Sequence, residues 1–219
     1  MTRADRVRTS TETTSDRLLD VETAALARLS AGVQRTADAA RERIGVAERG
    51  AGRLALLSAE LTPSSSWVSG VLLPVVADLL AASREQALEL LARQLAVIGS
   101  SVPGGRQLTE AGVQAARDAA PRVEREEYAA FGDAAARAWA AVDDRVSEQR
   151  RYWWARHEEP PALIARVCSR ERVALPGATR GAVWALEAPI QAAARASSVS
   201  LANRLLTVGM EGWNEARGG

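Results

Sequence analysis

The side chains that most often perform catalysis or bind metals are scarce in this chain of 219 residues. It contains one histidine, His157, and one cysteine, Cys168, and all 28 of its basic residues are arginine. Because lysine is missing, Schiff-base catalysis and a phosphate-binding P-loop lysine are excluded. A di-iron helical bundle requires Glu-x-x-His pairs, but Trp154 stands three residues before the single histidine. We therefore expect no catalytic residue, no metal site and no cofactor.

Three pairs of adjacent acidic residues are the remaining candidates for acid–base or Mg²⁺ chemistry. They are Glu126-Glu127, Asp143-Asp144 and Glu158-Glu159. Successive residues point about 100° apart on an α-helix, so the two carboxylates of a pair do not converge on one ligand. We interpret each pair as part of a solvated helix face. Cys168 follows residues 163–167, which are apolar except for Arg166, and this indicates a buried thiol rather than a nucleophile paired with His157.

Tryptophan is the residue whose distribution suggests binding. The chain has six Trp against one Phe and two Tyr, and Tyr152, Trp153 and Trp154 follow one another directly after Arg151. Three consecutive residues on a helix cannot all face one core, and Trp and Arg are enriched at interaction hot spots. We predict a protein-partner or homo-oligomer interface formed by these four residues. The alternative is that one Trp bridges two helices while its neighbour covers a loop.

Two further tryptophans are candidates for the same interface. Trp213 is an isolated aromatic residue in the last ten residues, which form a candidate docking peptide. Trp67 begins the most apolar run of the chain, residues 67–82. This run is either the central element of a bundle or a contact surface. At about 16 residues it is shorter than the ~20 that cross a bilayer, so we expect no transmembrane segment.

The elements that position these residues are predicted to be helices. Alanine dominates the apolar residues and aromatic residues make up only 4%, which suits helices packed closely through small side chains. Apolar residues also advance by alternating steps of three and four, the spacing of one helix face. In the last predicted helix these residues are Val183, Leu186, Ile190, Ala194, Ser197, Leu201, Leu205 and Val208. The predicted fold class is all-α: an elongated bundle, with coiled-coil character, of three to four long amphipathic helices plus shorter helices.

Glycine, proline and polar stretches divide the predicted helices. The predicted segments are a flexible N-terminal arm (1–16), a helical hairpin (17–99), a Gly/Pro linker (100–108), a second helical half (109–215) and a flexible tail (216–219). One continuous domain over 17–215 is the alternative. Pro121 is expected to end a helix that starts at Thr109, and Pro74 to kink the helix over 67–99 unless it falls in the first turn. Thr179 is the expected N-cap of the last helix, which Pro189 is expected to bend.

These features favour a non-enzymatic structural, assembly or adaptor subunit of a larger bacterial or phage complex. The arginine-only basic set is typical of a high-GC genome. The N-terminus lacks the apolar core of a signal peptide, so we expect a cytoplasmic protein, or one built into an assembly from the cytoplasm. A net charge of +1 provides no long-range field for nucleic acid.

Two other function classes remain open. In the first, the chain is an amphipathic coat of a lipid or polyester granule, because alanine-rich amphipathic helices are similar in character to phasins. In the second, it is a small-molecule sensor or enzyme with a pocket lined by Trp139, Trp184 and the apolar residues of 68–80.

Overall fold

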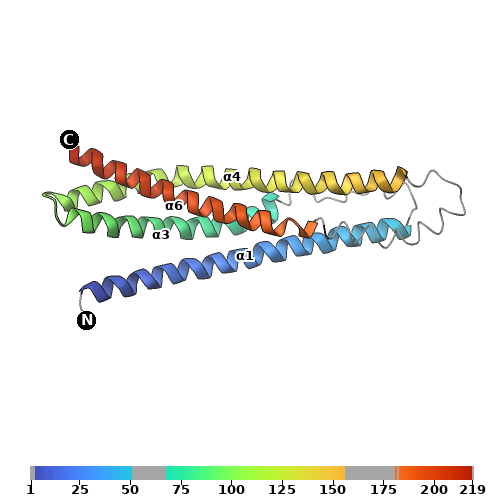
Figure 1. Ribbon diagram of the computed structural model, residues 1–219, viewed down its shortest axis with the longest axis horizontal. Helices are drawn as coiled ribbons and strands as arrows, with labels where there is room; N and C mark the ends of the chain where they lie inside the picture. The colour runs from blue at the N-terminus through green and yellow to red at the C-terminus, as the bar shows by residue number, and fades with distance from the viewer. Residues whose placement is uncertain (1–2, 51–67, 156–180, 182, 219) are drawn as a thin grey trace, which may run out of the picture. The chain divides into compact units, whose positions relative to one another are not determined.

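The computed structural model describes residues 3–50, 68–155, 181 and 183–218. These residues form four α-helices and no strand: α1 (Arg3–Gly50), α3 (Leu73–Gly99), α4 (Gly105–Ala155) and α6 (Glu187–Gly218). A π-helical turn, η1 (Val68–Leu72), directly precedes α3. The predicted all-α helical bundle is therefore confirmed (Figure 1).

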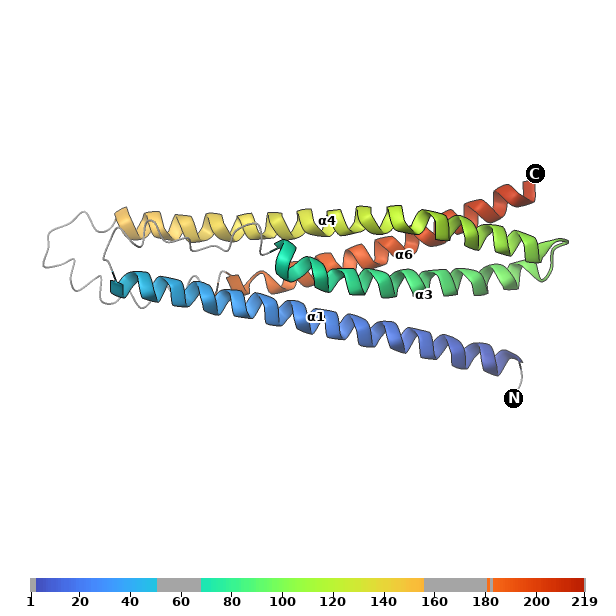
Figure 2. The same cartoon turned by 180° about the vertical axis from the view of Figure 1, so that it is seen from behind.

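The chain forms two compact units, and the boundary between them falls within α1, α4 and α6. Unit 1 comprises Met1–Ala27, Leu73–Gly132 and Ala193–Gly219, and unit 2 comprises Arg28–Leu72 and Asp133–Ala192. The two segments that flank the predicted 100–108 linker, α3 and the first part of α4, both belong to unit 1. In unit 1, α3 lies beside α4 and α6 in both views of the chain (Figure 2).

The N-terminal segment differs from its prediction, because α1 is helical from Arg3 onward instead of starting near Leu18. Residues 3–16 were expected to belong to a flexible arm because they are polar. They contain no glycine or proline, however, so no residue type that breaks helices interrupts them. The C-terminal end differs in the same direction, since α6 continues to Gly218 through part of the predicted flexible tail.

Pro121 is a position at which tertiary packing outweighs the local tendency of proline to end a helix. The prediction that Pro121 ends a helix was wrong, because α4 continues through it. An interior proline costs about 3 kcal/mol, but Ala116, Ala120 and Val123 are all buried around it, and their packing keeps the helix continuous. Pro121 itself faces solvent, and its carbonyl accepts a hydrogen bond of 3.1 Å from Arg125 Nε.

Pro74 and Pro189 stand near the starts of α3 and α6, positions at which proline is tolerated in helices. Pro74 is the second residue of α3, as the sequence allowed. Pro189 is the third residue of α6, which starts at Glu187 after a turn at residues 185–186. Thr179, the expected N-cap of the last helix, lies outside the described part of the chain.

The apolar run at the start of α3 is part of the core. Leu72, Val76, Leu79 and Leu80 are at most 1% exposed. The side chains of residues 67–69 lie outside the described part of the chain. The burial of the four core residues supports the interpretation of this run as the central element of a bundle rather than as an exposed contact surface. The predicted α6 stripe is likewise buried from Val183 to Leu205.

In unit 1 the C-terminal end of α6 approaches α4 unusually closely. A Cβ at Gly112 of α4 would lie 2.7 Å from the carbonyl oxygen of Gly209 and 2.7 Å from Leu95 Cδ1. A Cβ at Gly212 would lie 2.6 Å from the Cβ of Ala115, and one at Gly209 would collide with the Leu91 side chain. The absence of a side chain at these positions is therefore a steric requirement of the packing.

We expect Gly112→Ala to destabilise the protein by about 1–3 kcal/mol, because the new methyl group meets backbone that cannot move alone. Gly132→Ala in the same helix is the matched control. Its Cβ would lie 3.7 Å from Leu73 Cδ2, an ordinary contact. Alanine is the better helix former, so this control should stabilise by about 0.5–1 kcal/mol. Urea unfolding followed by circular dichroism measures both. Equal effects of the two substitutions would contradict the close approach.

Candidate interaction site

The structure describes the side chains of only some residues of the predicted interface. Residues 151–154 form the end of α4, but the side chains of Arg151, Tyr152, Trp153 and Trp154 lie outside the described part of the chain. Trp67 lies outside it as well, as do His157 and Cys168. An interface at these positions remains a prediction.

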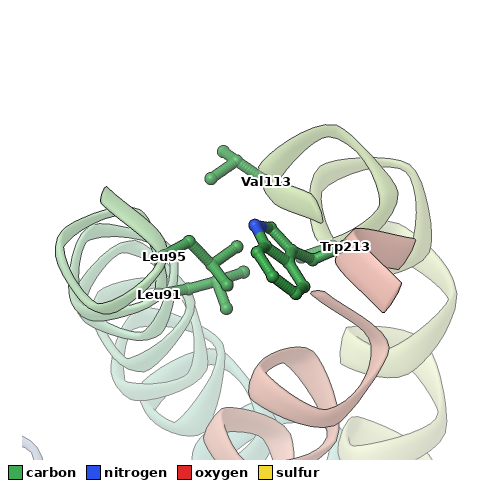
Figure 3. Close-up of a cluster of buried hydrophobic side chains, with 5 residues drawn as sticks. Leu91, Leu95, Val113 and Trp213 are labelled. Carbon is green, nitrogen blue, oxygen red and sulfur yellow. The ribbon is translucent and has the colours of Figure 1, made fainter. Parts of the chain in front are cut away.

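Trp213 is not the exposed anchor that its position near the C-terminus suggested. Its side chain is 3% exposed and packs in unit 1 against Leu91 and Leu95 of α3 and Val113 of α4 (Figure 3). The Arg217 guanidinium carbon lies 5.5 Å from the centre of its ring, within cation–π range. Trp213 is therefore a core residue of unit 1 that ties the end of α6 to the α3–α4 hairpin.

Trp184, in unit 2, is the exposed tryptophan in the described part of the chain, with 47% of its surface accessible. Its indole Nε1–H donates a hydrogen bond of 3.2 Å to Glu187 Oε2. The other carboxylate oxygen of Glu187 accepts hydrogen bonds from the Ser30 hydroxyl on α1, at 2.7 Å, and from Gln191 Nε2, at 3.2 Å. The ring therefore has a fixed polar edge, while much of its apolar surface remains exposed to solvent.

The local sequence explains how this arrangement arises. Glu187 is the first residue of α6, where a carboxylate interacts favourably with the helix dipole. Residues 184 and 191 stand three before and four after it, and these spacings lie on the same side of a helix. Val183 and Leu186 are buried, so the turn before α6 is anchored in the core of unit 2.

A shallow recess of about 470 Å³ adjoins Trp184. It is lined by Gly181, Trp184, Ala185, Glu187, Ala188 and Gln191. All of these residues belong to unit 2 and lie within eleven positions of the chain. The predicted pocket between Trp139 and Trp184 is a different arrangement, because the described residues that line this recess include neither Trp139 nor any of residues 70–80. It presents one carboxylate, one amide and one indole beside small apolar surfaces.

One acidic pair departs from its interpretation as a solvated face. Glu127 is only 7% exposed, and its Oε1 accepts hydrogen bonds from Ser200 Oγ at 2.7 Å and from Arg204 Nη1 at 2.8 Å. Its neighbour Glu126 is exposed and pairs with Nη2 of the same arginine. Arg204 on α6 thus bridges two consecutive carboxylates of α4. Paired in this way, the two acids stabilise the fold and hold no free base for catalysis.

The pKa values of Glu126 and Arg204 are shifted in the directions that stabilise both charges. The hydrogen bond from Arg204 holds the pKa of Glu126 below its ordinary value of 4.5, and Arg122 adds to the effect. Glu126 in turn raises the pKa of Arg204 above its ordinary value, with Glu127 contributing less.

The described part of the chain offers no other arrangement typical of catalysis or transport. Within it, no three His, Cys, Asp or Glu side chains gather in a way that holds a metal ion. Nor does any helix there combine the length and apolar character that a membrane crossing requires. No protein-family model, curated protein or solved structure matches the chain.

Sequence reasoning identified Trp184 only as a pocket residue and missed the role of Glu187. The signal was present in the spacing, because Trp184, Glu187 and Gln191 follow the three-and-four pattern of one helix side. The contribution of Ser30 was not accessible in this way, since 157 residues separate it from Glu187.

We expect Arg204→Met to destabilise the protein by about 1–3 kcal/mol at pH 7, because Glu127 then keeps a buried charge with only a hydroxyl partner. Arg204 holds the pKa of Glu126 below its ordinary value, so this pair contributes stability above the unfolded pKa of Glu126 and loses it as the pH falls through the folded value. The difference between variant and wild type should therefore shrink between about pH 5 and pH 3.

The control is Arg195→Met, which removes a more exposed pair with Glu22 at 2.7 Å. It should change stability by less than about 1 kcal/mol. Urea unfolding at pH 7, 5 and 3 compares the two variants. A loss in Arg204→Met that does not change with pH would show that the ion pairs contribute nothing.

Proposed function

We propose that the protein is a non-enzymatic helical assembly or adaptor subunit of a larger bacterial or phage complex. It acts in the cytoplasm or in an assembly built there, and it contacts a protein partner or another copy of itself through Trp184. The observation that carries this proposal is an exposed tryptophan held in place by Glu187, itself fixed by Ser30 and Gln191.

An aromatic ring fixed before binding is suited to a protein interface. Association normally loses free energy to the ordering of side chains, and a hydrogen-bonded indole has less freedom to lose. Tryptophan also provides a large contact area, and it is among the residues that dominate binding energies. The remaining exposed face of Trp184 is therefore a favourable anchor for a partner side chain or helix.

The charge distribution supports recognition by shape and apolar contact. The whole chain has a net charge of +1, which provides no strong field to attract nucleic acid or an anionic membrane surface. Glu187, which pairs with the indole, already accepts hydrogen bonds from three side chains. A partner that packs an apolar or aromatic group on Trp184 needs no compensating charge.

The recess beside Trp184 favours small-molecule binding as a second candidate function. Its volume of about 470 Å³ lies in the range of ligand pockets, and its lining combines an aromatic ring with a carboxylate and an amide. A metabolite that binds there should change the tryptophan emission of the wild type but not that of Trp184→Phe.

The assembly proposal predicts that Trp184→Ala weakens the association about tenfold or more, the effect of losing a hot-spot tryptophan. Val199→Ala is the matched control, because Val199 is 59% exposed and lies in unit 1. Sedimentation velocity measures self-association, and isothermal calorimetry measures binding of the protein that co-purifies from the native source. A monodisperse monomer that retains no partner would refute the proposal, as would equal affinities of the two variants.

A further inference from the structure

The last turns of α6 are attached to unit 1 differently from the rest of the helix. Up to Arg204, α6 is connected to its neighbours by polar contacts, including Ser83 Oγ to the Ser198 carbonyl at 2.8 Å and the bridge to Glu126 and Glu127. Beyond Arg204, the described residues make no hydrogen bond or ion pair from α6 to another helix. Thr207 Oγ1 donates only to the carbonyl of Asn203 in its own helix, and residues 214–218 are exposed.

Trp213 supplies the main anchor of this end, and it does so at a penalty. Its ring is buried against Leu91, Leu95 and Val113, which favours docking. Its Nε1–H is buried without a hydrogen-bond partner and lies on the side of the ring that faces Leu95 and Val113 (Figure 3). An unpaired buried donor costs about 1–3 kcal/mol, a penalty that is relieved as soon as the indole reaches water.

The backbone of the same segment is a poor helix former on its own. Gly209 and Gly212 each lower the helical tendency by about 1 kcal/mol relative to alanine. Both are required in the docked state, where Gly209 faces Leu91 and Gly212 faces Ala115. Docking and helix formation are therefore coupled, because the packing that compensates for the two glycines is lost when Trp213 leaves the core.

We propose that Gly209–Gly218 forms a C-terminal latch that opens as one unit while the rest of unit 1 stays folded. In the closed state the latch is helical and covers the apolar side chains of Leu91, Leu95 and Val113. In the open state it loses its helix and uncovers them. Opening of this kind is a sub-global unfolding step with a free energy below that of the whole domain.

Thiol labelling tests the latch in the full-length chain with Cys168 replaced by Ser. Ala116 and Ala194 are both fully buried in unit 1, the first in the Trp213 cluster and the second on α6 before Arg204. We expect the thiol of Ala116→Cys to react with an aromatic disulfide reagent about tenfold or more faster than that of Ala194→Cys. Adding Trp213→Ala should accelerate labelling at position 116 and leave position 194 unchanged.

Amide hydrogen exchange of the unmodified chain provides the second measurement and needs no cysteine substitution. In a latch, the amides of 210–217 exchange together, faster than those of 198–205, and Trp213→Ala accelerates the whole group. Simple fraying gives rates that fall gradually from Gly218 inward and do not respond to Trp213→Ala. That pattern would overturn the proposal, and so would equal labelling rates at positions 116 and 194.

Discussion

The docking of the end of α6 in unit 1 depends on its approach to α4 at backbone distance, at Gly112. At this point the neighbour of a Cα is a carbonyl oxygen, and the space that a methyl group would fill is already occupied by Leu95. Close approach lets Trp213 reach across α4 to the side chains of α3, so three helices share one apolar cluster. Alanine-rich neighbours such as Ala115 and Ala116 extend the same geometry, because small side chains allow short interhelical distances.

Close packing alone does not set the relative position of two helices, because apolar contact is not directional. The Arg204 bridge supplies the missing direction. It joins α6 to Glu126 and Glu127 at a second place along α4, and Ser200 adds a hydrogen bond to the buried carboxylate. One steric contact and one polar contact, separated along both helices, together fix the register of α4 against α6. A shift by one turn would leave the Glu127 charge buried and unpaired.

The helices and their buried faces were largely predictable, because spacing of apolar residues is a local property of the sequence. The stripe from Val183 to Leu205 was identified from that spacing and is buried. The errors arose where distant residues decide. Pro121 ends a helix in isolation but not when Ala120 and Val123 are buried beside it. Glu127 belongs to a solvated pair by local rules, and only the partner 77 residues away makes it part of the core.

The two tryptophans Trp184 and Trp213 show why the candidate site could not be read from residue type. Each has the same large apolar ring and the same single donor, and each stands on or next to α6. The ring of Trp213 packs against Leu91 and Leu95, but its Nε1–H donor has no hydrogen-bond partner. Trp184 has its donor satisfied by Glu187, and 47% of its surface is accessible to solvent. Water relieves the unpaired donor of Trp213, whereas the exposed ring of Trp184 favours contact with another molecule. This difference is the physical basis of the proposal that the partner binds at Trp184.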